Sequence, residues 1–407
     1  MWLRAKLAFR NTFRNQRRTF INILMISSGV CAMLVLEGFI HRIVTGLRET
    51  TIQTQTGHLQ IASKRYWKKN AKTAKETLLL QYQKWIPEIK KNPHVKYAVG
   101  HLKFYCLVSK SERSLSAQGV SFDPKEEAAR SKAYHYVKGR GLKAKRLYEI
   151  SVGVGLAKKL NLRTKDRVTL LAQTMDGVVN AIDVEVSGIF QTAIAEFDDA
   201  SFLIPLTTAQ SLLDTQGVEQ IIVGLNDTKS TSLVQRQIMA SLSLAKKGVE
   251  IKPWDWLATL YHQVSEFNRI QNVLFKIIIF SLIGLSILNT VGNSIAERTS
   301  EIGTIRALGE TKKSVIVQFI LEGLILGVMG AVSGIFLGIM TIYTINFLRI
   351  PIMMPGATAY FYLEIDLIKE SVAKGMGLAV IASVTAALLP ALRAARMNIV
   401  EALRRSH

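Results

Sequence analysis

The segment whose side chains have the most specific spacing has the sequence ERTSEIGTIRALG, at residues 297–309 between two long apolar runs. Its apolar side chains recur at seven- and three-residue steps, which places them along one side of a helix that Gly309 ends. These apolar positions are Ile295, Ile302, Ile305 and Leu308. Because charged residues flank them, the chemistry open to this segment is recognition of a protein surface. A solvated loop held on the lipid surface is the alternative interpretation.

Two carboxylates in the same segment, Glu297 and Glu301, are four residues apart and therefore repel each other on one face of a helix. The repulsion weakens an isolated helix by roughly a few tenths of a kcal/mol. We expect an external basic partner to relieve it.

Three ionisable residues, Glu37, Lys276 and Glu322, lie inside apolar runs, where a charge is costly and calls for an explanation. Glu37 and Lys276 are at the same predicted depth in their runs, so we hypothesise that they form an ion pair between adjacent helices. Snorkelling of both side chains to the outer headgroups is the alternative. Glu322 lies about two turns inside its run, and either a wet cavity or a bond to a neighbouring helix would explain it.

Signatures of catalysis are weak in this sequence. The nearest approach to a phosphate-binding loop, GETKKS at residues 309–314, lacks the second glycine before its lysine and does not follow a strand. The seven histidines have no metal-ligand spacing, and there is no GxSxG motif. We therefore expect no catalytic residue, no metal and no cofactor in this chain.

Long apolar stretches must position all of these residues, in keeping with an apolar share of 49%. Four stretches reach the ~20 residues needed to cross a hydrocarbon core. Lys and Arg cluster before the first stretch, between the second and third, and after the fourth, which predicts that both termini are cytoplasmic. The net charge of +22 is spread over these rims and the outer domain, which argues against nucleic acid binding and favours contact with anionic membrane lipid.

The predicted fold class is a membrane α-helical protein with four transmembrane helices in a 1+3 arrangement. A large extracytoplasmic α+β domain is inserted between the first helix and the second. The predicted segments are a cytoplasmic interfacial helix (1–19), the first span (20–41), the outer domain with a helical stalk at each end (42–272), the second span (273–291), a cytoplasmic coupling helix (292–314), the third span (315–345), a short outer loop (346–374), the fourth span (375–392) and a cytoplasmic tail (393–407).

Periodicity predicts the elements of the outer domain. Helical spacing occurs at 71–91 and 207–213, and strand-like alternation at 95–108, 167–172, 181–190 and 219–225. A mixed domain of more than 200 residues is large enough to bury its own core.

A ladder of glycines in the third span lets another helix approach closely. Its members are Gly323, Gly327, Gly330, Gly334 and Gly338. The fourth span has small residues at 379, 382, 383, 386 and 387, so we expect the two spans to pack on each other within one subunit. A translocation pore lined by these faces is the alternative.

Two further motifs are PALRAARMNIVEALR at residues 390–404 and GHLQI at residues 57–61. With ERTSEIGTIRALG and the 1+3 arrangement of spans, they make the chain resemble the permease subunits of the MacB, LolC/LolE and FtsX group of ABC transporters, also called type VII. The resemblance extends over essentially the whole chain. Residues 150–206 also resemble the MacB-like periplasmic core domain of that group.

The resemblance implies mechanotransmission in a bacterial inner membrane. A separate cytoplasmic ATPase resembling LolD binds ATP and dimerises, and the coupling helix passes its motion through the spans and stalks to the periplasmic domain. On this resemblance the residues that couple to the ATPase are Glu297, Arg298, Glu301, Ile302, Gly303, Arg306 and Leu308. We expect the chain itself not to be an enzyme, because the ATPase domain that is fused to MacB is missing from this sequence.

The resemblance also implies two permease chains per complex, either identical or paired as LolC is with LolE. GHLQI and the chain length favour the lipoprotein-releasing branch, with a lipoprotein or a periplasmic adaptor as a further partner. The alternatives are MacB-like efflux of peptides or drugs, and FtsX-like signalling to a periplasmic partner. FtsX-type chains are shorter and have smaller outer domains, which counts against the last alternative.

Overall fold

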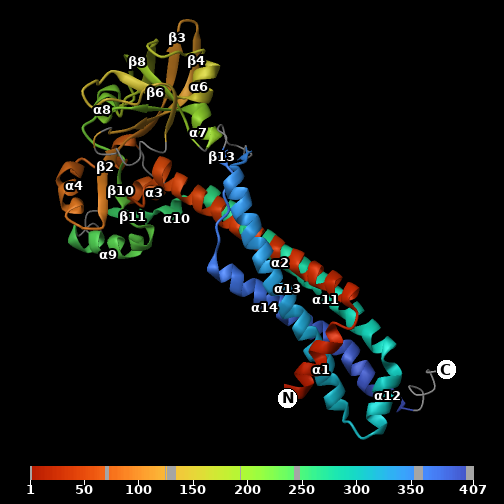
Figure 1. Cartoon of the computed structure of the whole chain (residues 1–407). Helices are drawn as coiled ribbons and strands as arrows, with labels where there is room; N and C mark the ends of the chain where they lie inside the picture. Colours follow the sequence, from red (N-terminus) through yellow and green to blue (C-terminus); the bar gives the residue numbers. More distant parts are fainter. Residues whose placement is uncertain are drawn as a thin grey trace. The chain divides into compact units, whose positions relative to one another are not determined.

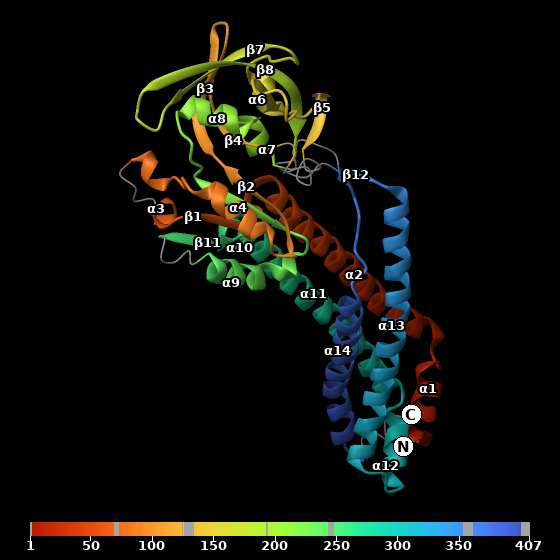
Figure 2. The ribbon, with the colours of Figure 1, turned by 90° about the vertical axis from the view of Figure 1, so that its left-hand side faces the viewer.

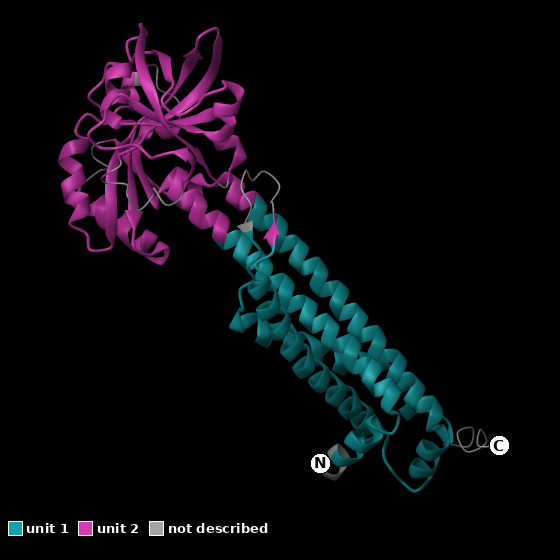
Figure 3. Ribbon diagram, turned by 45° about the horizontal axis from the view of Figure 1, so that its top comes forward, with its two compact units in different colours: residues 1–45, 264–350, 362–407 teal, residues 46–263, 351–361 magenta. Residues whose placement is uncertain are grey.

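The computed structural model describes residues 2–68, 73–123, 125, 134–192, 194–242, 248–352 and 361–399, and Figure 1 labels their elements. The chain divides into two compact units, which Figure 3 colours separately. Unit 1 comprises residues 1–45, 264–350 and 362–407, and unit 2 comprises residues 46–263 and 351–361.

Unit 1 is a bundle of helices. Four of its helices are long and apolar enough to cross a membrane: α2 (Gln16–Thr51), α11 (Thr259–Glu297), α13 (Lys312–Leu348) and α14 (Lys369–Arg396). Two shorter helices are α1 (Trp2–Thr12) and α12 (Thr299–Ala307), seen near the same end of the bundle in Figure 2. Each predicted span lies inside one of the long helices. The predicted interfacial helix (1–19) is divided between two helices, because a turn at residues 13–15 separates α1 from α2.

The glycine ladder of α13 packs against two different helices. A Cβ atom at Gly327 would lie 2.6 Å from Ser383 Oγ in α14, as the expected pairing of third and fourth spans requires. A Cβ at Gly330, however, would lie 2.5 Å from Cβ of Ile26 in α2. Gly323 and Gly327 thus pack against α14, whereas Gly330, Gly334 and Gly338 pack against α2. The expected packing of the third span on the fourth is therefore present at the inner two glycines, and the outer three pack on the first span, which was not expected.

One sheet of unit 2 closes on itself. Its strand order is β5-β8-β6-β9-β4-β3-β7, and a further pairing of β7 with β8 completes a ring. The strands are β3 (Lys103–Lys110), β4 (Arg113–Ser121), β5 (His135–Gly139), β6 (Glu149–Gly153), β7 (Arg167–Gln173), β8 (Val179–Gln191) and β9 (Ser201–Ile204). The alternating residues of β7 put Val168, Leu170 and Ala172 into the core. The helices α6 (Val154–Lys159), α7 (Ala195–Ala200) and α8 (Leu206–Leu213) accompany this sheet.

The second sheet of unit 2 has the order β11-β1-β10-β2. Its strands are β1 (Leu59–Ser63), β2 (Val95–His101), β10 (Gln220–Leu225) and β11 (Val249–Pro253), all antiparallel. The GHLQI motif leads into β1 at the centre of the sheet, where Leu59 and Ile61 are fully buried. Helices α4 (Tyr82–Lys90) and α9 (Thr231–Ser241) contribute to its core.

The remaining elements of unit 2 are short. They are η1 (Ile52–Thr56), α3 (Lys64–Lys68), η2 (Ala74–Thr77), η3 (Thr228–Ser230), α10 (Trp254–Leu257) and β12 (Pro351–Ile352), with β13 (Phe361–Tyr362) at the boundary of the units. The helix predicted over 71–91 is therefore too long. Its described part holds η2 and α4, because Leu79 bridges to Val218 in an extended conformation instead of continuing a helix. Residues 71 and 72 lie outside the described part of the chain.

Candidate functional site

The short helix α12 has a break in the helical backbone at each end. α11 ends at Glu297, and Arg298 leaves the helical conformation with φ −114° and ψ 19° before α12 begins at Thr299. At the other end, Gly309 has φ +101°, a conformation that favours glycine. Thr311 then caps α13 by accepting a hydrogen bond from the backbone N–H of Ser314 at 3.3 Å. α12 is thus a separate helix between two spanning helices.

The apolar residues of this region do not share one side, contrary to the sequence expectation. Ile295 and Ile302 are buried in the core of the helical bundle. Ile305 is 45% exposed and Leu308 is 83% exposed. The three-residue steps are the physical reason, because each such step turns the side chain by about 60° around a helix of 3.6 residues per turn, so Leu308 lies about 120° from Ile302. Two exposed apolar side chains therefore remain at the C-terminal end of α12.

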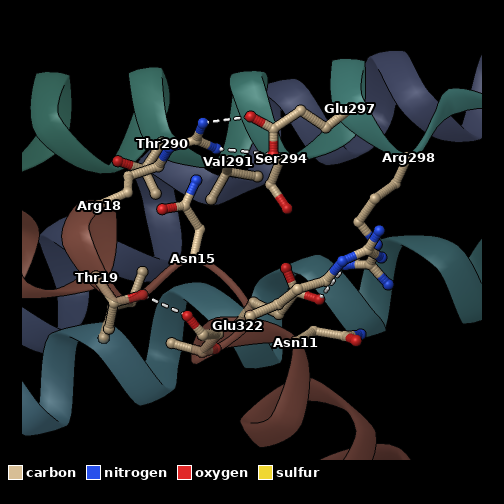
Figure 4. A pocket seen from close by; sticks show the side chains of 13 residues that line it. Asn11, Asn15, Arg18, Thr19, Thr290, Val291, Ser294, Glu297, Arg298 and Glu322 are labelled. Atoms are coloured by element: carbon tan, nitrogen blue, oxygen red, sulfur yellow. Dashed lines mark hydrogen bonds and ion pairs between the residues drawn. The ribbon is translucent and has the colours of Figure 1, made fainter.

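The two carboxylates of this region are paired within the chain, so the expectation that an external partner is needed to relieve their repulsion is wrong. Arg14 Nη1 lies 2.8 Å from Glu301 Oε1. Arg18 forms an ion pair with Glu297, which Figure 4 shows. The hydrogen bond from Arg14 holds the pKa of Glu301 below its usual value. Arg14 lies in the turn that joins α1 to α2, and Arg18 lies in the first turn of α2.

Arg298 connects α12 to the spanning helix α13. Its Nη1 lies 2.9 Å from Glu322 Oε1, and its Nε lies 3.2 Å from Glu301 Oε2. Glu322 is only 4% exposed, and the Arg298 guanidinium lies 5.9 Å from the centre of the Phe319 ring. Glu322 therefore bonds to Arg298, a residue outside its own helix, which is one of the two explanations that the sequence left open.

A cavity, which is the other feature that would explain Glu322, is present as well. A cavity of about 190 Å³ lies beside it within unit 1, and Figure 4 shows the polar side chains that point into this space. Its polar lining comprises Asn11, Thr12, Arg14, Asn15, Arg18, Thr19, Thr290, Ser294, Glu297, Arg298 and Glu322. At about 30 Å³ per molecule, this volume accommodates several waters.

The residues predicted to couple to an ATPase thus occupy different environments. Leu308 is exposed and Glu301 is partly exposed, whereas Arg298, Ile302 and Gly303 are buried. Arg306 Nη1 donates a hydrogen bond to the carbonyl of Met397 at 2.7 Å, which ties α12 to the residues after α14. Glu297 keeps about half of its side chain exposed beside Arg18.

The structure brings Glu37 and Lys276 together. Lys276 Nζ of α11 lies 2.6 Å from Glu37 Oε1 of α2, and Glu37 is buried. A further polar contact between these helices involves Asn22, whose Oδ1 accepts hydrogen bonds from Ser286 at 2.9 Å and Thr290 at 2.8 Å.

Sequence reasoning missed the roles of Arg14 and Arg18. Both belong to the basic run before the first span, which by itself indicates only orientation in the membrane. A periodic signal would not have linked them to α12, because 279 or more residues separate the partners. Within the described part of the chain, no group of three or more His, Cys, Asp or Glu residues is arranged to hold a metal ion.

Comparison with known families covers both units. A family described as "FtsX-like permease C-terminal" matches residues 273–399, and one described as "MacB-like periplasmic core domain" matches residues 19–241. The chain belongs to the FtsX-like permeases with a MacB-like periplasmic core domain. The FtsX-like match contains α12, α13 and α14 together with the end of α11. The resemblance to ABC transporter permeases of the MacB, LolC/LolE and FtsX group is thereby confirmed, as is a multi-pass membrane fold with a large periplasmic domain after the first helix.

Curated relatives of this permease fall into two groups. The macrolide export protein MacB of Campylobacter jejuni is 27% identical over 206 residues, which cover 50% of this chain and 30% of the relative. The lipoprotein-releasing protein LolC of Xylella fastidiosa is 26% identical over 284 residues, which cover 63% of this chain and 65% of the relative. This permease therefore spans about a third of the MacB relatives and less than two thirds of the LolC relatives.

Two solved structures are similar to the chain. The periplasmic region of MacB from Actinobacillus actinomycetemcomitans aligns with a TM-score of 0.37 at 10% identity, covering 52% of this chain and 95% of that one. The extracellular domain of YknZ, an ABC-type transporter of Gram-positive bacteria, aligns with a TM-score of 0.33 at 12% identity, covering 42% of this chain and 88% of that one.

Proposed function

We propose that this chain is the permease subunit of an ABC transporter on which a separate cytoplasmic ATPase, similar to LolD, docks at α12. The observation that carries this proposal is the exposure of Ile305 and Leu308 on a short helix between two spanning helices. Exposed apolar side chains beside charged ones are typical of a protein contact. Glu301 lies on the same helix, and its side chain is 45% exposed while it pairs with Arg14.

The proposed mechanism is mechanotransmission. ATP-driven closure of the ATPase moves α12, and α11 and α2 carry the displacement to unit 2. The length of these helices supports this role, since α11 has 39 residues and α2 has 36. α2 runs from unit 1 into residues 46–51 of unit 2, and α11 begins at residues 259–263 of unit 2 and runs into unit 1. Within unit 2 the ends of both helices share one apolar cluster, formed by Ile52, Trp254, Ala258 and Tyr261. Movement of either helix therefore reaches the same point of the domain.

We propose lipoprotein release from the inner membrane as the reaction, with two permease chains in the complex and both termini in the cytoplasm. The alignment with LolC supports this choice because it covers 63% of the chain, more than the 50% covered by the MacB relative. MacB-like export of a peptide or drug is the second candidate, and the match of residues 19–241 to the MacB-like core domain favours it.

Replacement of Leu308 by Asp tests the docking site. Leu308 is 83% exposed, so the substitution leaves the packing of the bundle intact and places a charge in the proposed contact. In mild detergent the wild-type chain should copurify with a cytoplasmic ABC ATPase, and the Leu308→Asp chain should retain at least tenfold less. Val178→Asp is the matched control, because Val178 is a 65% exposed apolar residue of unit 2. Equal retention of the ATPase by the Leu308→Asp chain would overturn the docking site.

The proteins that copurify with the wild-type complex test the reaction. A bound lipoprotein agrees with the proposed release reaction, an adaptor for an outer-membrane channel favours export, and a cell-wall hydrolase indicates signalling. Mass spectrometry of the purified complex distinguishes these outcomes.

A further inference from the structure

We infer that Arg298 and Glu322 are positioning residues that fasten α12 to α13, so that a displacement of α12 is transmitted to the spanning helices and is not absorbed at the break between α11 and α12. The inference rests on the proposed function, because it concerns how the motion of a docked ATPase leaves α12. It assigns Arg298 an internal role in place of contact with the ATPase.

The geometry forms a continuous series of charges. Arg14 pairs with Glu301 at 2.8 Å, Glu301 with Arg298 at 3.2 Å, and Arg298 with Glu322 at 2.9 Å. The series begins in the turn between α1 and α2, passes through α12 and ends in α13. Arg298 is its central member, and its planar guanidinium can hold two carboxylates in a fixed orientation.

The position of Arg298 explains why an ion pair between α12 and α13 is needed to transmit the displacement. Its backbone leaves the helical conformation, so α12 is joined to α11 by a non-helical residue that can act as a hinge. A hinge alone would let α12 tilt without moving the spanning helices. The Arg298 side chain crosses from this hinge to Glu322, ten residues after the start of α13. The Arg298–Glu322 ion pair therefore connects the hinge to a residue ten positions into the spanning helix α13.

The contacts in the series differ in strength. Arg298 and Glu322 are both buried, with 11% and 6% of their side chains exposed, so separating them would leave an unpaired charge inside the bundle. Arg14 and Glu301 are largely exposed, and pairs of that kind are weak. α12 and α13 are thus expected to move together, whereas the N-terminal turn can release α12.

The cavity beside Glu322 gives this movement room. Residues of the N-terminal segment, including Asn11, Asn15 and Thr19, form one part of its lining, and α11 and α13 form the rest. A close-packed interior resists displacement. The polar cavity is lined by Arg14, a member of the weak pair with Glu301. It allows the N-terminal segment to shift while the buried Arg298–Glu322 pair stays intact.

A double substitution, Arg298→Leu with Glu322→Leu, tests the inference. Replacing both members of a buried ion pair by apolar residues of similar size preserves folding better than removing one. The matched control is Arg140→Leu with Glu149→Leu, which removes an ion pair of unit 2 that lies outside α2, α11 and α12 and has a similarly buried carboxylate. Each chain is purified in full length, reconstituted in nanodiscs with the ATPase that copurifies with wild type, and compared in ADP and in a non-hydrolysable ATP analogue.

Two readouts separate a positioning role from a structural one. The first is the amount and hydrolysis rate of the bound ATPase, which should stay within twofold of wild type in both double variants. The second is the nucleotide-dependent change in amide hydrogen exchange of residues 52–63 in unit 2. We expect this change to fall at least fivefold in the Arg298/Glu322 variant and to persist in the control. An Arg298→Lys chain, which keeps the charge, should recover part of it.

Persistence of the full exchange response in the Arg298/Glu322 variant would overturn the inference and leave the pair a structural contact only. An equal loss in the control would also overturn it, since the removal of any buried ion pair would then suffice. Failure of the proposed function has a different signature, because the wild-type chain would then bind no ATPase.

Discussion

At the scale of single residues, the charges buried among the spanning helices are paired across elements. Glu37 pairs with Lys276, and Glu322 pairs with Arg298. The cost of an unpaired buried charge makes such partners necessary. The sequence could indicate Lys276, because it shares a predicted depth with Glu37. It could not indicate Arg298 for Glu322, because that partner comes from the break between two helices, whose position only the folded chain defines.

His58 is a residue of unit 2 whose titration the structure constrains. It precedes β1, its Nδ1 accepts a hydrogen bond from the backbone N–H of Leu225 at 3.1 Å, and burial lowers its pKa to about 4. The unfolded chain binds a proton near pH 6.5 and the folded chain only near pH 4, so stability falls as the pH drops through this window. The loss approaches about 3 kcal/mol at the lower limit.

Urea unfolding of the full chain in detergent, followed by tryptophan fluorescence, measures this effect, because Trp67, Trp85, Trp254 and Trp256 all lie in unit 2. The His58→Asn chain keeps an acceptor near Nδ1 but does not titrate, so its free energy of unfolding should change less between pH 6.5 and 4. Identical pH dependence of the two chains would contradict the assignment.

At the scale of elements, close packing of helices in unit 1 depends on small residues at defined positions. The three- and four-residue steps of the glycines in α13 made the existence of a contact surface predictable. The small residues of the fourth span indicated α14 as one partner, but the second partner was not predictable, because the surface turns along the helix from α14 toward α2. For the strands of unit 2 as well, the elements were predictable but their partners were not. Alternation indicated β7 and β8, but nothing local to either strand indicates that their pairing closes a ring.

Two glycine substitutions test the packing of α13 on α2. A Cβ at Gly334 would lie 2.7 Å from the backbone oxygen of Ser27, so Gly334→Ala should force the helices apart and cost about 1–3 kcal/mol. A Cβ at Gly292 of α11 would meet no neighbouring group within 4 Å, and Gly292→Ala should be neutral or stabilise by about 0.5–1 kcal/mol. The midpoint of thermal unfolding in detergent compares them. Equal midpoints would contradict the proposed contact.

At the scale of the whole molecule, the 1+3 arrangement of spans around a large inserted domain followed from the sequence, because long apolar runs and basic rims are strong signals. The contacts of α12 could not be predicted from the sequence. Placing Leu308 on the same side as Ile302 failed, because two three-residue steps turn it by about 120° around α12 and leave it exposed. That exposure is the basis on which we assign α12 to the docking of an ATPase, and the rest of the proposed mechanism depends on it.

Photo-crosslinking from position 308 tests this assignment most directly. A benzophenone amino acid is incorporated at Leu308 of the full chain in its native membrane, with position 178 of unit 2 as the control, and the products are identified after irradiation. Docking on α12 predicts a covalent product between position 308 and a cytoplasmic ABC ATPase, and none between position 178 and that ATPase. Products at position 308 that contain only lipid or this chain, in membranes where the ATPase is bound to the complex, would contradict the account.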